Sequence, residues 1–87
     1  MKIISLVPSI TEALFDMGLT KAEIIGRTKF CIHPENQVKN VAVIGGTKSI
    51  NIEKIRSLNP DIIIANKEEN TKEDVEELQK YFKVLVT

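Results

Sequence analysis

The sequence predicts an α/β fold in which a mostly parallel sheet of four or five strands lies between helices on both faces. Short apolar runs alternate with amphipathic segments along the 87 residues, and this alternation of strands and helices is typical of parallel sheets. The most apolar runs lack the polar alternation of a half-exposed strand, which indicates strands that are covered on both faces. Right-handed crossovers would then place the loops that follow the strands along one edge of the sheet.

The first strand is expected at residues 3–7, and the helix after it is expected to begin at Ser9. Ser9 and Glu12 have the spacing of a capping box, in which each side chain satisfies a backbone N–H group of the first turn. Gly18 then supplies the left-handed residue that ends the helix. Four apolar residues at helical spacing should form the buried stripe: Ile10, Ala13, Leu14 and Met17.

The middle of the chain should contain two more short strands. A turn at residues 20–23 precedes the second strand, which is expected at residues 24–28. Residues 29–40 have no clear period, so we expect a loop with room for one helical turn. The third strand is expected at residues 41–44, and the glycine pair 45–46 should end it.

Asn51 and Thr71 are the expected N-caps of the two remaining helices. Pro60 ends the first of these helices, because a proline disfavours helical geometry in the residue before it. The fourth strand is expected at residues 61–65 and the fifth at residues 83–87. The residues expected to face the sheet from these two helices are Ile52, Ile55, Leu58, Val75, Leu78 and Phe82.

Composition fits a single domain over residues 1–87 and excludes several functional classes. Hydrophobic residues make up 43% of the chain, and 12 acidic residues balance 12 basic ones. Proteins that bind nucleic acid usually carry a basic excess, so this balance argues against such a partner. A lone cysteine excludes an internal disulfide framework. No apolar run approaches the roughly 18 residues that span a bilayer.

The loops after the strands are the expected functional segments, since ligands of parallel sheets bind beyond the carboxyl ends of the strands. These loops are residues 8–11, 28–34, 45–51 and 66–71. The third loop begins Gly-Gly-Thr-Lys-Ser, but a phosphate-binding loop requires glycine where Thr47 and Ala42 stand. The charged run at residues 67–70 is interpreted as solvated surface. No catalytic set emerges from these loops, and we expect neither an enzyme nor a resident cofactor.

Cys31 and His33 are the only cysteine and the only histidine of the chain. At this spacing in an extended segment the two side chains would point to the same side, and a thiolate with an imidazole suits zinc. A metal site needs further ligands, and none stands at a matching spacing. A buried cysteine beside a loop histidine is the simplest interpretation. The alternative is a small cytosolic metal-binding protein or a thiol-dependent enzyme that uses Cys31 and His33.

Two motifs connect the chain to a known family. Residues 5–12 read Ser-Leu-Val-Pro-Ser-Ile-Thr-Glu, and residues 51–61 read Asn-Ile-Glu-Lys-Ile-Arg-Ser-Leu-Asn-Pro-Asp. With the segments between and after them, they resemble the N-terminal lobe of class III substrate-binding proteins of ABC importers. These are receptors with a helical backbone for cobalamin, haem and ferric siderophores. The resemblance implies a three-layer, Rossmann-like lobe, with the ligand held between it and a second lobe that these residues lack.

The resemblance also implies roles for individual residues. Glu53 matches the acidic residue that docks onto arginines of the permease subunits. Phe30 matches an aromatic ligand contact, and His33 replaces a second aromatic. Thr47 and Asn66 replace two tryptophans that cradle cobalamin, so we expect a smaller or more polar metal chelate, with His33 near the metal or an anionic group. The ligand-binding residues implied by the resemblance are Pro8, Ser9, Phe30, His33, Thr47 and Asn66.

The expected partners are a metal-chelate small molecule and the permease subunits of an ABC importer. The resemblance implies a periplasmic or extracytoplasmic location. Residues 1–7 lack the features of a secretory signal, so the sequence alone also allows a cytoplasmic location. A further hypothesis is a lobe that binds no ligand and self-associates through the surface that a second lobe would cover.

Overall fold

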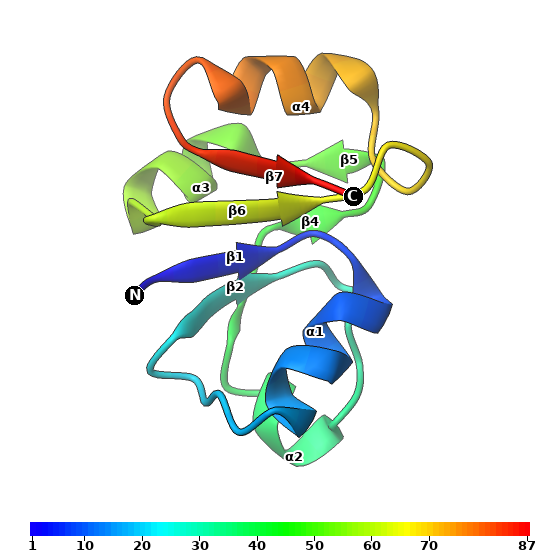
Figure 1. The fold of residues 1–87 in the computed structure, drawn as a ribbon, viewed down its shortest axis with the longest axis vertical. Coiled ribbons are helices and arrows are strands. Elements are labelled where there is room, and N and C mark those ends of the chain that lie inside the picture. Colours follow the sequence, from blue (N-terminus) through cyan, green and yellow to red (C-terminus); the bar gives the residue numbers. More distant parts are fainter.

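A five-stranded parallel sheet forms the centre of the computed structural model, which describes all 87 residues. The strands pair in the order β3-β2-β1-β6-β7, with every pair parallel (Figure 1). This confirms the predicted α/β class and sheet type. The strands of this sheet are β1 (Ile3–Ser5), β2 (Ile24–Arg27), β3 (Ala42–Val43), β6 (Ile62–Ala65) and β7 (Val84–Val86).

The structure contains four helices. Their bounds are α1 (Pro8–Asp16), α2 (Glu35–Val38), α3 (Ile52–Leu58) and α4 (Lys72–Gln79). Figure 1 shows α1 with α2 on one side of the strands and α3 with α4 on the other. Phe15 of α1 and Val38 of α2 pack in one buried cluster with Ile24 of β2. The larger cluster joins α3 and α4 to β1 and β6, and the order of the strands places the helices as right-handed crossovers require. None of the four helices is both long and apolar enough to cross a bilayer.

The central strand β1 is buried on both faces, as its apolar pattern predicts. Ile4 is 0% exposed and belongs to the larger cluster, and Ile3 is 8% exposed. Burying an isoleucine of this kind contributes about 1.5–3 kcal/mol. The eight buried residues of the larger cluster therefore supply most of the hydrophobic stabilisation of the lobe: Ile4, Leu6, Ile44, Ile55, Ile63, Ala65, Val75 and Leu78.

The predicted ends of three helices are confirmed. The side chains of Asn51 and Thr71 accept hydrogen bonds from backbone N–H groups in the first turns of α3 and α4, at 3.0 Å and 3.2 Å. Gly18 follows α1 with φ of +100°. Its N–H group donates to the carbonyl of Phe15, and the N–H group of Leu19 donates to that of Leu14. This pair of bonds forms a Schellman motif, which requires the left-handed conformation that glycine adopts without strain.

The start of α1 differs from the prediction. The helix begins at Pro8, its N-cap is Val7, and no side chain caps it. Proline fits the first helical position because its fixed φ suits the helix and it has no N–H group to leave unpaired. Ser9 therefore lies inside the first turn, and the predicted capping box between Ser9 and Glu12 is wrong.

The buried face of α1 is also different. Thr11 and Phe15 are its buried residues, whereas Ala13 and Met17 of the predicted stripe are exposed. The hydroxyl of Thr11 donates to the carbonyl of Val7 at 3.1 Å, so this polar side chain is satisfied inside the lobe. A hydroxyl that finds such a partner can be buried at little cost, and the helix turns this residue toward the sheet.

Residues 45–50 form a small hairpin where the sequence predicts a plain loop. Its strands β4 (Gly45–Gly46) and β5 (Ser49–Ile50) pair antiparallel as a separate two-stranded sheet. Gly45 has φ of +116°, and a Cβ atom there would collide with the carbonyl oxygen of Ser49. Only glycine is compatible with this turn. The third strand is correspondingly shorter than predicted, and the helical turn allowed in residues 29–40 is present as α2.

The turn before β2 contains a carboxylate whose charge stabilises the fold. Glu23 accepts hydrogen bonds from the backbone N–H group of Thr20 at 2.7 Å and from its hydroxyl at 3.1 Å. These bonds, that to the backbone first, lower the pKa of Glu23 below its ordinary value of 4.5. The folded state thus binds a proton less readily than the unfolded state, so the stabilisation is present above this value and is lost as the pH falls below it.

Replacing Glu23 with glutamine should therefore reduce the loss of stability in acid. The amide still accepts hydrogen bonds but does not titrate, so the difference between the urea midpoints at pH 6 and pH 3 should be smaller for Glu23→Gln than for the wild type. Glu12→Gln is the control, because the Glu12 carboxylate accepts no hydrogen bond and the pH dependence should be retained. Equal pH dependence in Glu23→Gln and the wild type would contradict the assignment.

Candidate functional site

The parallel sheet brings the four predicted loops to one edge. Each of these loops follows the carboxyl end of a strand of the same sheet, and parallel strands end at the same side. We call this edge the carboxyl rim and define it as residues 8–11, 28–34, 45–51 and 66–71. All six predicted ligand-binding residues belong to the carboxyl rim, whereas Glu53 lies just beyond it in the first turn of α3.

One buried side chain joins three segments of the rim. Asn70 is 2% exposed, and its Nδ2 group donates to the carbonyl oxygens of Leu6 at 3.2 Å and Thr47 at 2.9 Å. Its Oδ1 atom accepts from the backbone N–H group of Asn66 at 2.9 Å. The end of β1, the hairpin and the loop after β6 are therefore held at fixed distances from one another.

Sequence reasoning missed Asn70, because the residue stands at the end of a charged run, Lys67 to Asn70, that was interpreted as solvated surface. The structure shows that Lys67, Glu68 and Glu69 are exposed, as expected, and that Asn70 is not. No local pattern marks it, since the carbonyl groups that it satisfies lie 64 and 23 residues away.

Asn66 uses its own side chain to fold the loop after β6. Its Oδ1 atom accepts from the backbone N–H groups of Glu68 at 2.8 Å and Glu69 at 3.0 Å, and its Nδ2 group donates to the hydroxyl of Thr87 at 3.2 Å. Such an Asx turn substitutes for backbone hydrogen bonds. A ligand would therefore meet a half-buried amide that is already engaged on both sides.

Phe30 presents an aromatic ring at the surface of the rim. It is 53% exposed. Its ring approaches Gly46 of the hairpin, where a Cβ atom would lie 3.5 Å from Cε2 of Phe30. The ammonium group of Lys29 lies 5.2 Å from the ring centroid, and the Lys29 N–H group donates to the carbonyl of Gly45 at 2.8 Å. The loop after β2 and the hairpin thus form one continuous surface.

Cys31 and His33 do not point to the same side. Cys31 is 0% exposed, with its sulfur 3.2 Å from the hydroxyl oxygens of Thr11 and Thr28, whereas His33 is exposed. The expectation fails because the segment is not extended: the Cys31 N–H group donates to the carbonyl of Thr28 at 3.1 Å, which closes a turn. The buried-cysteine interpretation is confirmed. No group of three or more His, Cys, Asp or Glu side chains is placed to share a metal ion.

Pro8 and Ser9 occupy the first turn of α1, where Pro8 is half-buried and Ser9 is exposed. Thr47 stands at the tip of the hairpin and is half-buried. Its carbonyl group accepts a hydrogen bond from Asn70, and the next residue back, Gly46, approaches the ring of Phe30. The structure therefore brings Phe30, Thr47 and Asn66 into one connected part of the rim, and no hydrogen bond links His33 to it.

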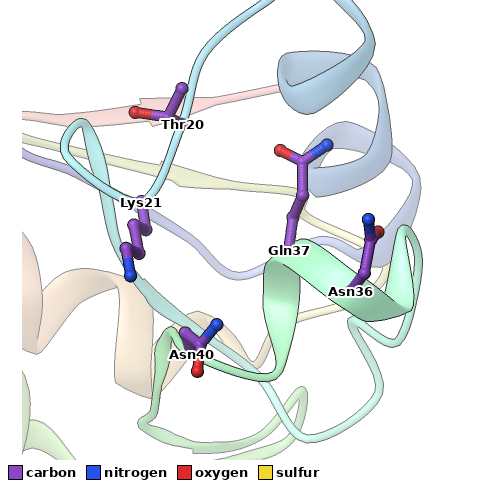
Figure 2. A pocket seen from close by; sticks show the side chains of 5 residues that line it. All are labelled: Thr20, Lys21, Asn36, Gln37 and Asn40. Carbon is purple, nitrogen blue, oxygen red and sulfur yellow. The ribbon is translucent and has the colours of Figure 1, made fainter.

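The hollows of the surface lie away from Phe30 and Thr47. One polar hollow has a volume of about 280 Å³. Figure 2 shows the side chains that line it. Its lining residues precede β2 and β3, at the opposite edge of the sheet: Thr20, Lys21, Asn36, Gln37 and Asn40. A second hollow lies between α4 and β7 and includes the rim residues Lys67 and Asn70. A shallow third one is lined by Glu53, Arg56 and Ser57. Around Phe30 and Thr47 the rim is an open surface.

Comparison with known proteins identifies relatives over nearly the whole chain. The sequence profile of the family described as periplasmic binding protein matches residues 3–87. The vitamin B12-binding protein of Vibrio vulnificus is 34% identical over 84 residues, which are 95% of this chain and 30% of that protein. An uncharacterised ABC transporter substrate-binding lipoprotein of Bacillus subtilis is 38% identical over 65 residues, 75% of this chain and 20% of that protein.

A solved structure agrees with these similarities. The periplasmic vitamin B12 binding protein of Vibrio cholerae superposes with a TM-score of 0.85 at 30% sequence identity, over 98% of this chain and 33% of the other. The chain therefore spans no more than a third of the length of these relatives.

Removing the Asn70 amide should destabilise the lobe and loosen its rim. Asn70→Ala leaves the carbonyl groups of Leu6 and Thr47 without a donor, at a cost of about 2–3 kcal/mol. Urea denaturation should show this loss, and the amide proton of Asn66 should exchange faster with solvent. Asn36→Ala is the matched control, because Asn36 is exposed and its side chain forms no hydrogen bond, so it should change stability by less than about 0.5 kcal/mol. Equal stability of the two variants would contradict the role of Asn70.

Proposed function

Since the chain belongs to the periplasmic binding protein family, we propose that residues 1–87 form one lobe of a receptor that delivers a metal chelate to an ABC importer. The main support is the carboxyl rim, where an exposed aromatic ring and polar loops are held together at the ligand-binding edge of a parallel sheet. The names of the relatives, a vitamin B12-binding protein and an ABC transporter substrate-binding lipoprotein, support the same function.

A second lobe would complete the binding site. The rim is open around Phe30, so a ligand resting on it would keep much of its surface in water, whereas small-molecule sites bury most of the ligand. One half of the sheet also lacks full cover: Leu85 of β7 is 51% exposed, and its register partner Ile64 is only half-buried. Closure of two lobes would stabilise the bound state through contacts that the open state lacks.

The charges of the rim favour a chelate with anionic groups. Lys29 and Lys48 belong to the rim, and neither lies within ion-pair distance of a carboxylate, because both ion pairs of the structure are formed by residues 72–80 of α4 and its C-cap. The ammonium group of Lys48 donates only to the carbonyl of Glu68 at 3.1 Å. A ligand carboxylate or catecholate would gain charge-assisted hydrogen bonds from such lysines. Haem and ferric siderophores carry these groups.

Glu53 would provide the contact with the importer. Its carboxylate is exposed in the first turn of α3 and accepts no hydrogen bond. We assign it the docking role toward basic residues of the permease subunits, where charge complementarity mainly sets the rate and orientation of encounter. This role places the working protein outside the cytoplasm. The thiol-dependent alternative has less support, because the Cys31 sulfur contacts two threonine hydroxyls rather than His33.

Removal of the aromatic ring of the rim should weaken ligand binding. In the full natural protein, Phe30→Ala should raise the dissociation constant about tenfold, which corresponds to about 1.4 kcal/mol, for whichever of cyanocobalamin, haem or a ferric catecholate binds. Fluorescence titration measures this change. Tyr81→Ala is the matched control, since Tyr81 is an exposed aromatic outside the rim and its removal should leave affinity unchanged. Binding of none of the three chelates would contradict the proposed function.

His33 is tested separately because no contact ties it to the rest of the rim. If it reaches the metal or an anionic group of the ligand, His33→Ala should weaken binding of the same chelate at least about fivefold, which corresponds to about 1 kcal/mol. Isothermal titration calorimetry of the variant and the wild type measures this change. Equal affinity of the variant and the wild type would exclude His33 from the site.

A further inference from the structure

The exposed side of α3 contains a cation–π contact to the segment that follows α4. The guanidinium carbon of Arg56 lies 4.3 Å from the ring centroid of Tyr81. Tyr81 is 47% exposed, and its N–H group donates to the carbonyl of Leu78 at 3.0 Å, which fixes its backbone against α4. A helix and a neighbouring turn are therefore joined at the surface by one arginine and one aromatic ring.

Arg56 has a second candidate partner on its own helix. Glu53 is three residues earlier, and side chains at this spacing are neighbours on the helix surface. Both residues line the shallow third hollow together with Ser57. The carboxylate and the guanidinium nevertheless form no ion pair, because the two pairs present are Lys72–Glu76 and Lys80–Glu77. The ring of Tyr81 holds the arginine instead.

The magnitudes of the two contacts agree with this outcome. A cation over an aromatic ring at an exposed site contributes about 0.5–1 kcal/mol, whereas an ion pair between residues three apart on a helix contributes about 0.2–0.5 kcal/mol. No other neighbouring side chain forms a hydrogen bond or an ion pair with the Glu53 carboxylate in place of Arg56. The Ser57 hydroxyl donates to the carbonyl of Lys54 at 2.6 Å, and residues adjacent in a helix, such as Glu53 and Lys54, do not face each other.

We propose that Tyr81 is a positioning residue of a protein-docking surface: it holds Arg56 aside and so leaves the Glu53 carboxylate free to bind an arginine of a partner protein. The inference rests on the proposed function, in which that partner is a permease subunit, and it adds the two residues that decide whether Glu53 is available. Arginine suits the site because its planar group pairs with a carboxylate through two hydrogen bonds.

The contact itself has a spectroscopic signature. Methylene protons held over an aromatic ring resonate upfield, so the side-chain protons of Arg56 should be shifted upfield in the wild type and in Tyr81→Phe. In Tyr81→Ala they should return to ordinary positions. Ordinary positions in the wild type would show that Arg56 is not held by the ring and would overturn the proposal.

The consequence for docking is the affinity for an arginine-containing partner. It is measured by titrating a diarginine peptide with blocked ends into the full natural protein and following the backbone amide signal of Glu53. Tyr81→Ala should weaken peptide binding about twofold, because released Arg56 competes for the carboxylate and an ion pair of up to about 0.5 kcal/mol corresponds to that factor. Tyr81→Phe should bind as the wild type does. With Arg56→Ala as background, Tyr81→Ala should have no further effect, which separates competition from a general loss of folding.

Two outcomes distinguish failure of the inference from failure of the proposed function. If Glu53→Gln weakens peptide binding but Tyr81→Ala does not, Glu53 binds arginine and the positioning role of Tyr81 is wrong. If Glu53→Gln binds the peptide as tightly as the wild type, the docking role of Glu53 fails, and the inference fails with it. An equal loss from Tyr81→Ala in the presence and absence of Arg56 would also overturn the proposal, since it would indicate a structural effect.

Discussion

The arrangement of the candidate site depends on the buried amide of Asn70. A parallel sheet aligns its strands but provides no hydrogen bonds between the loops beyond them, so carbonyl groups at buried strand ends need other donors. The Asn70 amide donates twice and accepts once, to Leu6, Thr47 and Asn66. An aspartate at this position would have no donors and would bring a charge into a site that is 2% exposed, at a far greater cost. The neutral amide therefore suits the geometry of the rim, and it holds the backbone at Thr47 and Asn66 in place.

The hairpin that Asn70 holds is itself made possible by two glycines. Gly45 takes a positive φ that would strain any other residue, and the N–H group of Lys29 donates to its carbonyl. A Cβ atom on Gly46 would lie 2.9 Å from the hydroxyl oxygen of Ser49 and 3.5 Å from the ring of Phe30. The absence of side chains lets the loop after β2 approach the hairpin backbone, and this approach supports the ring of Phe30 from one side. The exposed aromatic surface thus depends on main-chain geometry more than on contacts of the ring itself.

Features with local causes could be predicted from the sequence, and features with distant causes could not. The caps at Asn51 and Thr71 and the glycine after α1 depend on residues within one turn, and all three are confirmed. The edge that carries the functional loops was also predictable, because the topology of a parallel sheet determines it. The burial of Thr11 was not, since its hydroxyl meets a sulfur atom 20 residues away. Asn70 was hidden for the same reason: its carbonyl partners lie just after β1 and in the hairpin, and nothing near it in the chain indicates them.

The chain has no net charge, and on two of its surfaces an aromatic ring contacts a cationic side chain. Because the overall balance gives no long-range attraction of either sign, steering of a ligand or partner has to come from the placement of individual groups. On the rim, Phe30 keeps the ammonium group of Lys29 at the surface that we assign to the ligand, where a positive charge favours an anionic chelate. On α3, the guanidinium group of Arg56 lies over the ring of Tyr81. In the role that we propose for Tyr81, this contact would keep Arg56 from pairing with Glu53 on the surface that we assign to the importer. The same kind of contact therefore lies beside both surfaces that we propose for binding, and the two proposed functions should respond separately to substitutions at Phe30 and Tyr81.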